Sequence, residues 1–450
     1  MGIERAVVVG SGVAGASVAF ALARRGVQVT VVDASEPAAA TLAGAGIIQP
    51  WGSSVEGPYY ELYAAGADYY PTLLDQLAAA GGTDVGYRRV GAIIVSADAH
   101  ALDAAEQRVR GRVAQHPIAG QVRRISPQEA RSLFPPLDSA LSGVWIEGAA
   151  RVDGRALRAA LLRASERLGA RVLTGVATVA LDASGHPRVR VGPGAGGDRS
   201  GGAGLDGPGV RDGPGAHDAG VHEGGAHDSG ADSARARDAG TGNASADTLD
   251  ASADTLDAGA DSTSADTLDA GADLAADAII VAAGAWTNSV LGPLGATVDV
   301  SPQRGQISHL RLDGVDTSTW PSVSPIGSHY LLAFDDSRVV VGATRETGAG
   351  FDARVTASGQ REVLDAALAT APGLADAGLI ETRVGLRPLS GDDVPHIGAL
   401  PGHPRVFVAT GFGAGGLTMG PVVGELLASV IADADAAATG TLAPFVPRLR

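Results

Sequence analysis

The hydrophobic pattern at the start of the chain predicts a strand, a turn, a helix and a second strand. Residues 6–9 (AVVV) are a short apolar run rich in valine, which is typical of a buried parallel strand. Small and apolar residues continue through a helix that we expect over about 13–25, and Gly26 ends it. The segment 27–33 (VQVTVVD) alternates and then becomes apolar, so it predicts a second strand that ends at Asp33.

Comparable patterns recur along the rest of the chain. Leucines share one face of a helix predicted within residues 153–169, and Gly169 ends that helix. Strands are predicted at 87–96, 172–181, 278–282, within 303–345 and at 406–411, and a late helix at about 419–431. Strands and helices thus alternate at both ends of the chain around a β-rich middle, which predicts an α/β fold.

Glycines in the first turn indicate a dinucleotide site. Gly10, Gly12 and Gly15 form the pattern G-x-G-x-x-G directly after the first strand. In this pattern the first glycine allows a tight turn, the second lets the backbone approach a pyrophosphate, and the third lets the helix pack closely on the sheet. The diphosphate would lie at the helix N-terminus, and Asp33 is placed to bind a ribose.

Two other interpretations of residues 6–35 are weaker. A secretion signal needs an unbroken apolar core and a cleavage site, but here glycines interrupt the core. The segment also continues into Arg24, Arg25 and a further strand. A strand–helix–strand unit without any ligand is the remaining alternative.

Residues 192–273 are an insert of low complexity. The segment consists mainly of Gly, Ala, Asp and Ser, and ADTLDA occurs in it three times. Without aromatic residues it cannot offset the entropy of ordering, so we predict a disordered surface loop. Its repeats lack the glycines of known calcium-binding repeats, and no metal is expected. Since residues 187–192 and 278–282 both resemble strands, the insert is interpreted as an enlarged hairpin loop that leaves the fold intact.

Composition limits the partners and the chemistry. The net charge of the 450 residues is −16, but the insert alone, with sixteen acidic residues and four arginines, accounts for −12 of it. No basic stripe suggests a nucleic acid, and no apolar run predicts a transmembrane segment. The chain has neither cysteine nor lysine, which excludes a disulfide, a cysteine-linked flavin and a lysine base. We expect a cytoplasmic protein.

Four stretches together resemble the FAD-dependent D-amino-acid oxidase family, which includes glycine oxidases and D-amino-acid dehydrogenases. They are the glycine pattern, IIVAAGAWTNSVL (279–291), PQRGQI with VVVGATRETGAGFD (within 302–352), and VGLRPLSGDDVPHIG with VFVATGFGAGGLTMGP (within 384–421). The resemblance covers the chain except 192–273. It implies non-covalent FAD in a Rossmann-like domain built from discontinuous segments, with a β-rich substrate domain beside it. The expected FAD-binding domain is 1–75, 145–191, 274–300 and 384–450, and the expected substrate domain is 76–144 and 301–383.

The resemblance also implies the residues that contact FAD. The first turn would hold the pyrophosphate, Thr41–Pro50 would pass the flavin ring, and the backbone of Val179 would touch the adenine. N–H groups before the late helix would point at the flavin edge that becomes negative on reduction. The implied cofactor-binding residues are Gly10, Gly12, Val13, Ala14, Gly15, Asp33, Ala34, Thr41, Gly44, Ala45, Gly46, Val179, Ala283, Gly284, Gly413, Gly416, Leu417 and Thr418.

For the substrate, Arg387 in GLRP matches the family's carboxylate-binding arginine, a planar and permanently charged group suited to that role. A structural salt bridge is the alternative for Arg387. Tyr330 is expected to face the substrate. Trp51, Tyr59 and Tyr60 are candidates for either the pocket or the core, His396 is more simply structural, and Arg304 is expected at the domain junction.

These features predict an oxidoreductase that converts a small amino acid, either a D-amino acid or a glycine-like amine, into an imine and then into a keto acid and ammonia. Oxygen or another carrier would accept the electrons. Phe412 and Ala414 stand where several glycine oxidases have His and Arg, which weakens that specific assignment. Three alternatives remain: a 2-hydroxy acid dehydrogenase, an NAD-binding protein without flavin, and a scaffolding protein that uses the acidic insert.

Overall fold

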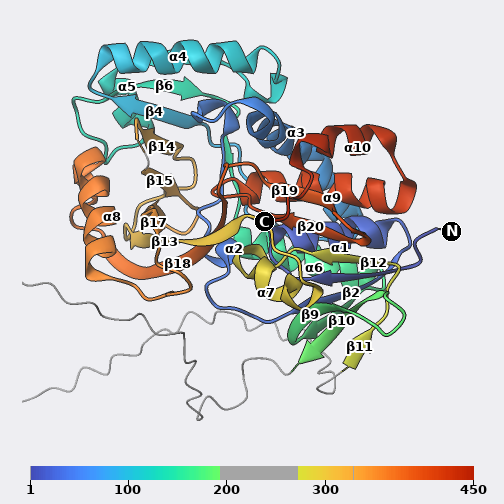
Figure 1. Ribbon diagram of the computed structural model, residues 1–450. Coiled ribbons are helices and arrows are strands. Elements are labelled where there is room, and N and C mark those ends of the chain that lie inside the picture. The colour runs from blue at the N-terminus through green and yellow to red at the C-terminus, as the bar shows by residue number, and fades with distance from the viewer. Residues whose placement is uncertain (1, 193–271, 328) are drawn as a thin grey trace, which may run out of the picture. The chain divides into compact units, whose positions relative to one another are not determined.

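A parallel sheet in the computed structural model joins strands that lie far apart in the sequence (Figure 1). The structure describes residues 2–192, 272–327 and 329–450. The strand order is β19 (His396–Leu400), β20 (His403–Thr410), β12 (Ala278–Val281), β1 (Arg5–Val9), β2 (Gln28–Asp33) and β8 (Arg171–Thr174). All neighbours in this order are parallel except β19 and β20. The carboxyl ends of the parallel strands therefore meet at one edge, where open α/β sheets bind ligands.

The two faces of this sheet carry different layers. Along β1 and β12, Val8 and Ile280 pack into the core formed with the helices, whereas Val7 and Ile279 pack into a second core with the β9–β10 hairpin. This alternation follows from the two-residue period of a strand. The helices on the first face are α1 (Val13–Arg24), α3 (Gly57–Ala79), α6 (Gly154–Arg167) and α9 (Gly416–Asp433). The hairpin strands are β9 (Val176–Leu181), β10 (Pro187–Gly192) and β11 (Ala272–Leu274).

A larger, mostly antiparallel sheet forms the β-rich part of the molecule. Its order is β17 (Glu346–Thr347), β13 (Val300–Arg311), β16 (Arg338–Gly342), β15 (Tyr330–Ala333), β14 (Ser322–Pro325), β4 (Ala92–Ser96), β6 (Ser142–Ile146) and β5 (Val122–Ile125), and β18 (Gly378–Ser390) also pairs with β13. The helices of this part are α4 (Ala99–Val113), α5 (Pro127–Leu133) and α8 (Ala357–Thr370). Figure 1 shows α4 and α5 beside β4 and β6, and α8 beside β13 and β18.

Strand β18 reaches from this larger sheet to the parallel one. The N–H of Leu386 donates to the carbonyl of Ala38, and the N–H of Gly413 donates to the carbonyl of Pro388. The middle of β18 therefore lies between the two sheets. The remaining elements are α2 (Ala40–Ala43), α7 (Thr287–Leu291), α10 (Ala436–Leu442) and the short ribbon of β3 (Ile47–Ile48) with β7 (Ala150–Arg151).

The predicted α/β class is confirmed, and so are the strand, helix and strand predicted at the start of the chain. The insert does connect antiparallel neighbours, but the expected second strand is wrong. β10 pairs with β11, where Val189 lies opposite Leu274, whereas 278–281 form β12 of the parallel sheet. The predicted disorder of the insert falls almost wholly outside the described residues. The domain boundaries stay a prediction, and β18 places residues 384–390 in the larger sheet. The strand expected over 87–96 begins only at Ala92, because Gly91 has a positive φ of 77°.

Helix α3 was not predicted from the sequence. It contains Pro71 and two glycines, Gly57 and Gly66, which conceal its helical pattern. Among the described residues, α9 is the helix long and apolar enough to cross a membrane, but 56% of it is buried inside the molecule. It packs against α1 and α3, so we interpret it as a core helix.

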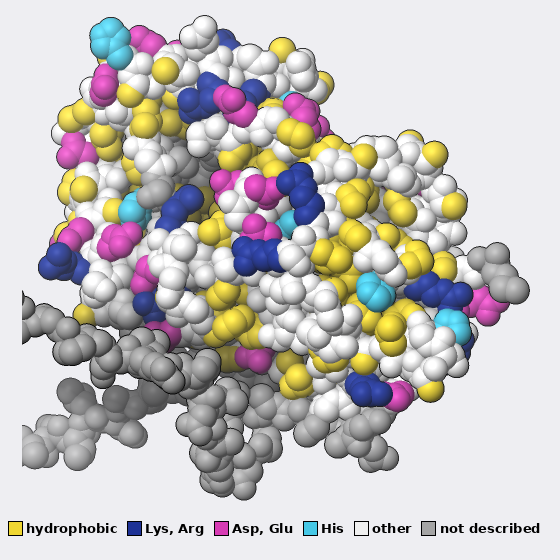
Figure 2. All heavy atoms as spheres, in the orientation of Figure 1, with side chains coloured by type: hydrophobic (Ala, Val, Ile, Leu, Met, Phe, Trp, Pro, Cys, Tyr) yellow, Lys and Arg dark blue, Asp and Glu magenta, His cyan; other side chains and the backbone are white. Residues whose placement is uncertain are grey.

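On the face shown in Figure 2, arginines and acidic side chains are intermingled.

Helices α1 and α9 approach each other closely through glycines. A Cβ atom on Gly424 would lie 2.5 Å from the Cβ and 2.6 Å from the carbonyl carbon of Ser17. One turn earlier, a Cβ on Gly420 would lie 3.0 Å from a methyl group of Val13. The backbones can be this close only where side chains are absent, and the contact brings the N-termini of both helices to the same edge of the sheet.

We predict that Gly424→Ala destabilises the protein. The added methyl group meets backbone atoms of α1, and overpacking of this kind costs about 1–3 kcal/mol in unfolding free energy. The free energy would be measured by urea unfolding. Gly440→Ala in α10 is the matched control, since a Cβ there meets nothing within 4 Å. Equal stability of the Gly424→Ala variant and the wild type would show that the helices can separate at no cost.

Candidate active site

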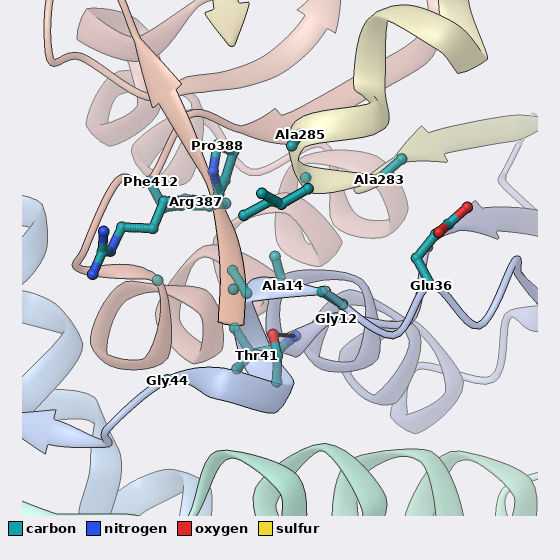
Figure 3. Close-up of a pocket in the computed structure, with 18 of the residues that line it drawn as sticks. Gly12, Ala14, Glu36, Thr41, Gly44, Ala283, Ala285, Arg387, Pro388 and Phe412 are labelled. Carbon is teal, nitrogen blue, oxygen red and sulfur yellow. Dashed lines mark hydrogen bonds between the residues drawn. The ribbon is translucent and has the colours of Figure 1, made fainter. Parts of the chain in front are cut away.

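A cavity of about 390 Å³ lies at the carboxyl edge of the parallel sheet and extends to the larger sheet. Its walls come from the β1–α1 turn, the end of β2, the segment from α2 to β3, the segment after β12, the β13–β18 region and the start of α9. Figure 3 shows Glu36 and Arg387 at opposite ends, with Gly12, Ala14 and Thr41 between them. The cavity is therefore long, and its two ends carry opposite charges.

Most of the predicted site residues line this cavity. They are Gly10, Gly12, Val13, Ala14, Asp33, Ala34, Thr41, Gly44, Ala45, Gly46, Ala283, Gly284, Tyr330, Arg387, Gly413, Gly416 and Leu417. Three predicted residues are not among the lining residues. A Cβ on Gly15 would lie 1.9 Å from the carbonyl oxygen of Gly10, so its part is close packing. Val179 is buried in the second core while residues 175–178 line the cavity, and Thr418 is buried behind Leu417.

Two helices begin at the cavity, and their first backbone N–H groups face it. The cap residues of α1 and α9 are Gly12 and Gly415, and neither has a capping side chain. Thr41 Oγ1 accepts a hydrogen bond from the N–H of Val13 at 2.9 Å. Helix N-termini attract anions because their N–H groups and dipoles point outward. The site thus has room for two negative groups, one at each helix.

Backbone geometry keeps the glycine turns compact. Gly10 has a φ of 96°, and a Cβ there would lie 2.5 Å from the carbonyl oxygen of Ala282. Gly46 has a φ of 93°, and a Cβ there would lie 1.8 Å from the carbonyl oxygen of Val152. Positive φ and the absence of space both require glycine at these positions. The cavity floor is therefore bare backbone, as an extended planar cofactor needs.

The acidic end of the cavity is held together by Asp33. Its Oδ2 accepts from the N–H of Ser11 at 2.6 Å, and its Oδ1 accepts from the N–H of Ser35 at 2.7 Å. The carboxylate thus ties the end of β2 to the glycine turn. Arg158 donates to the carbonyl of Ser11 at 2.8 Å and steadies the same turn. Glu36 also lines this end and was not predicted.

The opposite end is organised around Arg387. Its Nη1 donates to the carbonyl oxygen of Thr344 at 3.0 Å and to Oε1 of Gln303 at 3.4 Å. A Cβ on Gly305 would lie 2.4 Å from both Nη1 and Nη2, so the guanidinium occupies space that Gly305 leaves free. Burial, with the nearby charge of Arg345, lowers the pKa of Arg387 from its ordinary value. A guanidinium starts so far above neutrality that it stays charged.

Tyrosines beside Arg387 stay neutral. Burial raises the pKa of Tyr330, although Arg387 and Arg345 act in the opposite direction. Burial also raises the pKa of Tyr63, which lines the cavity from α3. Tyr59, four residues earlier, donates to the carbonyl oxygen of Phe412 at 3.0 Å behind the cavity wall. These phenols can donate hydrogen bonds but offer no negative charge.

Several residues that line the cavity were not predicted from the sequence. Missed residues include Tyr63, Trp286, Arg345, Phe412 and Ala414 as walls of the cavity. Arg345 lies inside the stretch RETG, which carried part of the resemblance, and that was its only signal.

Several weaker candidates are structural. Trp51 is buried in the core, and Arg112 stacks over the Tyr60 ring at 4.1 Å. His396 is buried, with Nε2 at 3.2 Å from the carbonyl oxygen of Asp299. Arg304, expected at the domain junction, instead pairs within the larger sheet, with Glu346 at 2.7 Å.

Comparisons with known proteins agree with this geometry. The profile of the family DAO, FAD dependent oxidoreductase, matches residues 5–203 and 247–430, so its gap lies within the insert. The chain is 38% identical over 427 residues to the uncharacterized oxidoreductase YurR of Bacillus subtilis (strain 168), with 94% of each chain covered. It is 30% identical over 162 residues to the glycine oxidase of Pseudomonas putida, which spans 36% of this chain and 43% of that one.

Solved structures give the same result over nearly the full length. The iminodiacetate oxidase of Chelativorans sp. BNC1 is 39% identical, with a TM-score of 0.77 over 98% of this chain and 99% of that chain. The glycine oxidase of Geobacillus kaustophilus is 22% identical and shares the fold, with a TM-score of 0.70 over 99% of both chains.

The chain belongs to the FAD-dependent oxidoreductase family that includes the D-amino-acid oxidases. It is an enzyme, and its cofactor is FAD, which sets aside the NAD-binding alternative. The residues present fit this cofactor. A long cavity with a bare glycine floor and two helices that begin at it with glycine as the cap residue match an extended dinucleotide.

We predict that Asp33→Ala weakens FAD binding. The variant removes the carboxylate predicted to bind the ribose, and losing one hydrogen bond between FAD and a charged group costs about 1.5–3 kcal/mol, roughly a 10- to 100-fold rise in Kd. The Kd would be measured by fluorescence titration of FAD into the cofactor-free protein. Asp182→Ala is the control, because Asp182 also accepts two backbone N–H groups but at a hairpin turn outside the cavity lining. An unchanged Kd for Asp33→Ala would contradict the assignment of this end to the adenosine.

Proposed function

We propose that this enzyme oxidises the α-carbon–nitrogen bond of a small amine that carries a carboxylate, either a D-amino acid or a glycine-like amine. The observation that carries the proposal is the guanidinium of Arg387 at the end of the cavity. Its Nη1 is held by Thr344 and Gln303, and its Nη2 makes no hydrogen bond within the described residues. A fixed, planar cation of this kind suits a carboxylate. Tyr330 lines the same end and can donate a further hydrogen bond.

The neighbouring residues suit FAD as follows. The N-terminus of α1, at Gly12–Ala14, would hold the pyrophosphate, and Asp33 with Glu36 would face the ribose. Gly44–Gly46 and the N-terminus of α9, at Gly416–Leu417, would flank the flavin ring. When bound, FAD supplies a two-electron acceptor at N5 that takes a hydride from the substrate.

The residues of this chain then have defined tasks. Arg387 binds the carboxylate and so turns the α-carbon toward the ring, and the N–H groups of Gly416 and Leu417 stabilise negative charge at its far edge. The α-carbon loses a hydride and the nitrogen loses a proton as the C=N bond forms. Water then hydrolyses the imine to a keto acid and ammonia, or to a primary amine when the substrate is a secondary amine.

The amine proton leaves to solvent in this scheme. Among the described residues that line the cavity there is no histidine, and Asp33 and Glu36 lie at the other end. Tyr330 and Tyr63 are neutral because burial raises the pKa of each phenol. The substrate must therefore react as the neutral amine.

The amines to be tested as substrates are chosen from the names of the similar proteins. The similar proteins are an iminodiacetate oxidase and glycine oxidases, so glycine, sarcosine, D-alanine and iminodiacetate form the panel. The first experiment is the visible spectrum of the purified protein, followed by each amine without oxygen. Bleaching of the flavin band by one of these amines supports the proposal, and a band that persists with all of them, but bleaches with a 2-hydroxy acid, favours the alternative chemistry. Oxygen or another carrier as acceptor, and a cytoplasmic location, stay predictions.

We predict that Gly305→Ala weakens substrate binding while the fold and the FAD content stay unchanged. The new methyl group must displace the guanidinium of Arg387, which is the flexible end of a side chain. Loss of a charged hydrogen bond corresponds to a rise in KM of roughly 10- to 100-fold. Steady-state kinetics with the best amine measures this. Gly111→Ala in α4 is the control, because a Cβ there meets nothing within 4 Å. A normal KM for Gly305→Ala would argue that Arg387 does not bind the carboxylate.

We also predict that kcat/KM for an amine rises with pH, about tenfold per unit from about pH 6 to about pH 9, as the neutral amine accumulates. Arg387 stays charged, and the raised pKa values of Tyr330 and Tyr63 keep both phenols neutral over this range, so the slope reports the substrate. A 2-hydroxy acid should give a flat profile over the same range. A flat profile for the amine would instead require a group that deprotonates the ammonium form.

A further inference from the structure

We propose that Arg345 is a second carboxylate-binding residue, which selects small amines that carry two carboxylates. The inference rests on the proposed function, because it assigns the first carboxylate to Arg387. Arg345 lines the same cavity and comes from the segment between β16 and β17. Its side chain is exposed, and within the described chain it forms no ion pair with a carboxylate.

The segment around Arg345 explains why the side chain faces the cavity. Thr344 and Glu346 share one side, where Thr344 Oγ1 donates to Glu346 Oε1 at 2.7 Å. In extended backbone, successive side chains point to opposite sides, so Arg345 points the other way. The carbonyl oxygen of Thr344 also accepts the hydrogen bond from Arg387. One short stretch of chain thus carries Arg345 and holds the guanidinium of Arg387.

The nearby acid cannot neutralise Arg345. Glu346 Oε2 accepts from Arg304 at 2.7 Å, and its Oε1 accepts from Gln306 at 2.7 Å as well as from Thr344. The carboxylate of Glu346 is therefore already paired with Arg304, on the side of the chain opposite to Arg345. Arg345 and Arg387 both lower the pKa of the same phenol, Tyr330, which shows that both positive charges act on this end of the cavity.

Arg345 and Arg387 have no carboxylate among the described residues that line their end of the cavity, and two such cations favour a ligand with two negative groups. One guanidinium is enough for a simple amino acid, and a second would leave an unbalanced positive charge beside the flavin site. An amine flanked by two carboxylates balances both, with the oxidised carbon near the carboxylate on Arg387 and the other carboxylate on Arg345. Planar guanidinium groups suit carboxylates at both positions.

The test measures binding to the FAD-loaded enzyme. Thiodiglycolate is a dicarboxylate whose sulfur replaces the amine, and (methylthio)acetate is its counterpart with one carboxylate, so neither provides an amine to oxidise. Their Kd values would be measured by titration calorimetry and by the change in the flavin absorbance. We expect Arg345→Gln to weaken thiodiglycolate about tenfold or more and to leave (methylthio)acetate unchanged, in line with a lost charged hydrogen bond. Arg345→Lys should retain part of the affinity.

Arg361→Gln is the matched control, because Arg361 is an exposed arginine of α8 outside the cavity lining. Equal weakening of both ligands by Arg345→Gln, or no weakening of either, would overturn the inference. So would a wild-type enzyme that binds thiodiglycolate no better than (methylthio)acetate.

Turnover of the panel amines separates the inference from the proposed function. If amines are oxidised while Arg345→Gln has no effect on iminodiacetate relative to sarcosine, the inference fails and the proposed function stands. If no amine is oxidised but thiodiglycolate binding depends on Arg345, the proposed oxidation fails and the dicarboxylate site stands.

Discussion

The close crossing of α1 and α9 is the constraint on which the site depends. Gly420 and Gly424 have no side chains where α9 meets α1, so the two backbones lie almost in contact. Helix α3 follows the same rule, because a Cβ on Gly66 would lie 2.4 Å from the carbonyl oxygen of Thr418. As a result, the first turns of α1 and α9 open into one cavity. One packing interaction therefore sets the spacing between the two positive helix ends that an extended FAD molecule needs.

The second constraint is the path of β18 from the larger sheet to the parallel one. Gly385 packs against α2, where a Cβ would lie 2.9 Å from the Cβ of Ala43, and Leu386 hydrogen-bonds to the backbone of Ala38. Arg387 is the next residue, so its guanidinium reaches the cavity from a strand anchored on both sides. The backbone of Arg387 is thereby fixed by strand pairing, so little of its conformational entropy is left to lose if the side chain binds a ligand.

The sequence was sufficient for the first strand–helix–strand unit, because its periods, its glycine spacing and Asp33 all indicate the same structure. It also identified the insert as a hairpin loop, but it took 278–282 as the second strand, because β11 has only three residues and too short a pattern to be recognised. It could not show α3, because Gly66, which allows close packing against α9, and Pro71 hide the helical pattern. Nor could it reveal Arg345, because only the alternation of Thr344 and Glu346 around it, visible in three dimensions, turns that side chain into the cavity.

The charges of the cavity explain how cofactor and substrate can be oriented independently. Asp33 and Glu36 lie at one end, and Arg345 and Arg387 lie at the other, as Figure 3 shows for Glu36 and Arg387. A carboxylate that enters the cavity is repelled by the acidic end and attracted by the arginines, so it cannot compete for the ribose position. In the proposed arrangement helix N–H groups, rather than side-chain cations, would hold the pyrophosphate between the two ends, which would keep the arginines available for the substrate. Separation of charge along one long cavity thus assigns each negative group its own place.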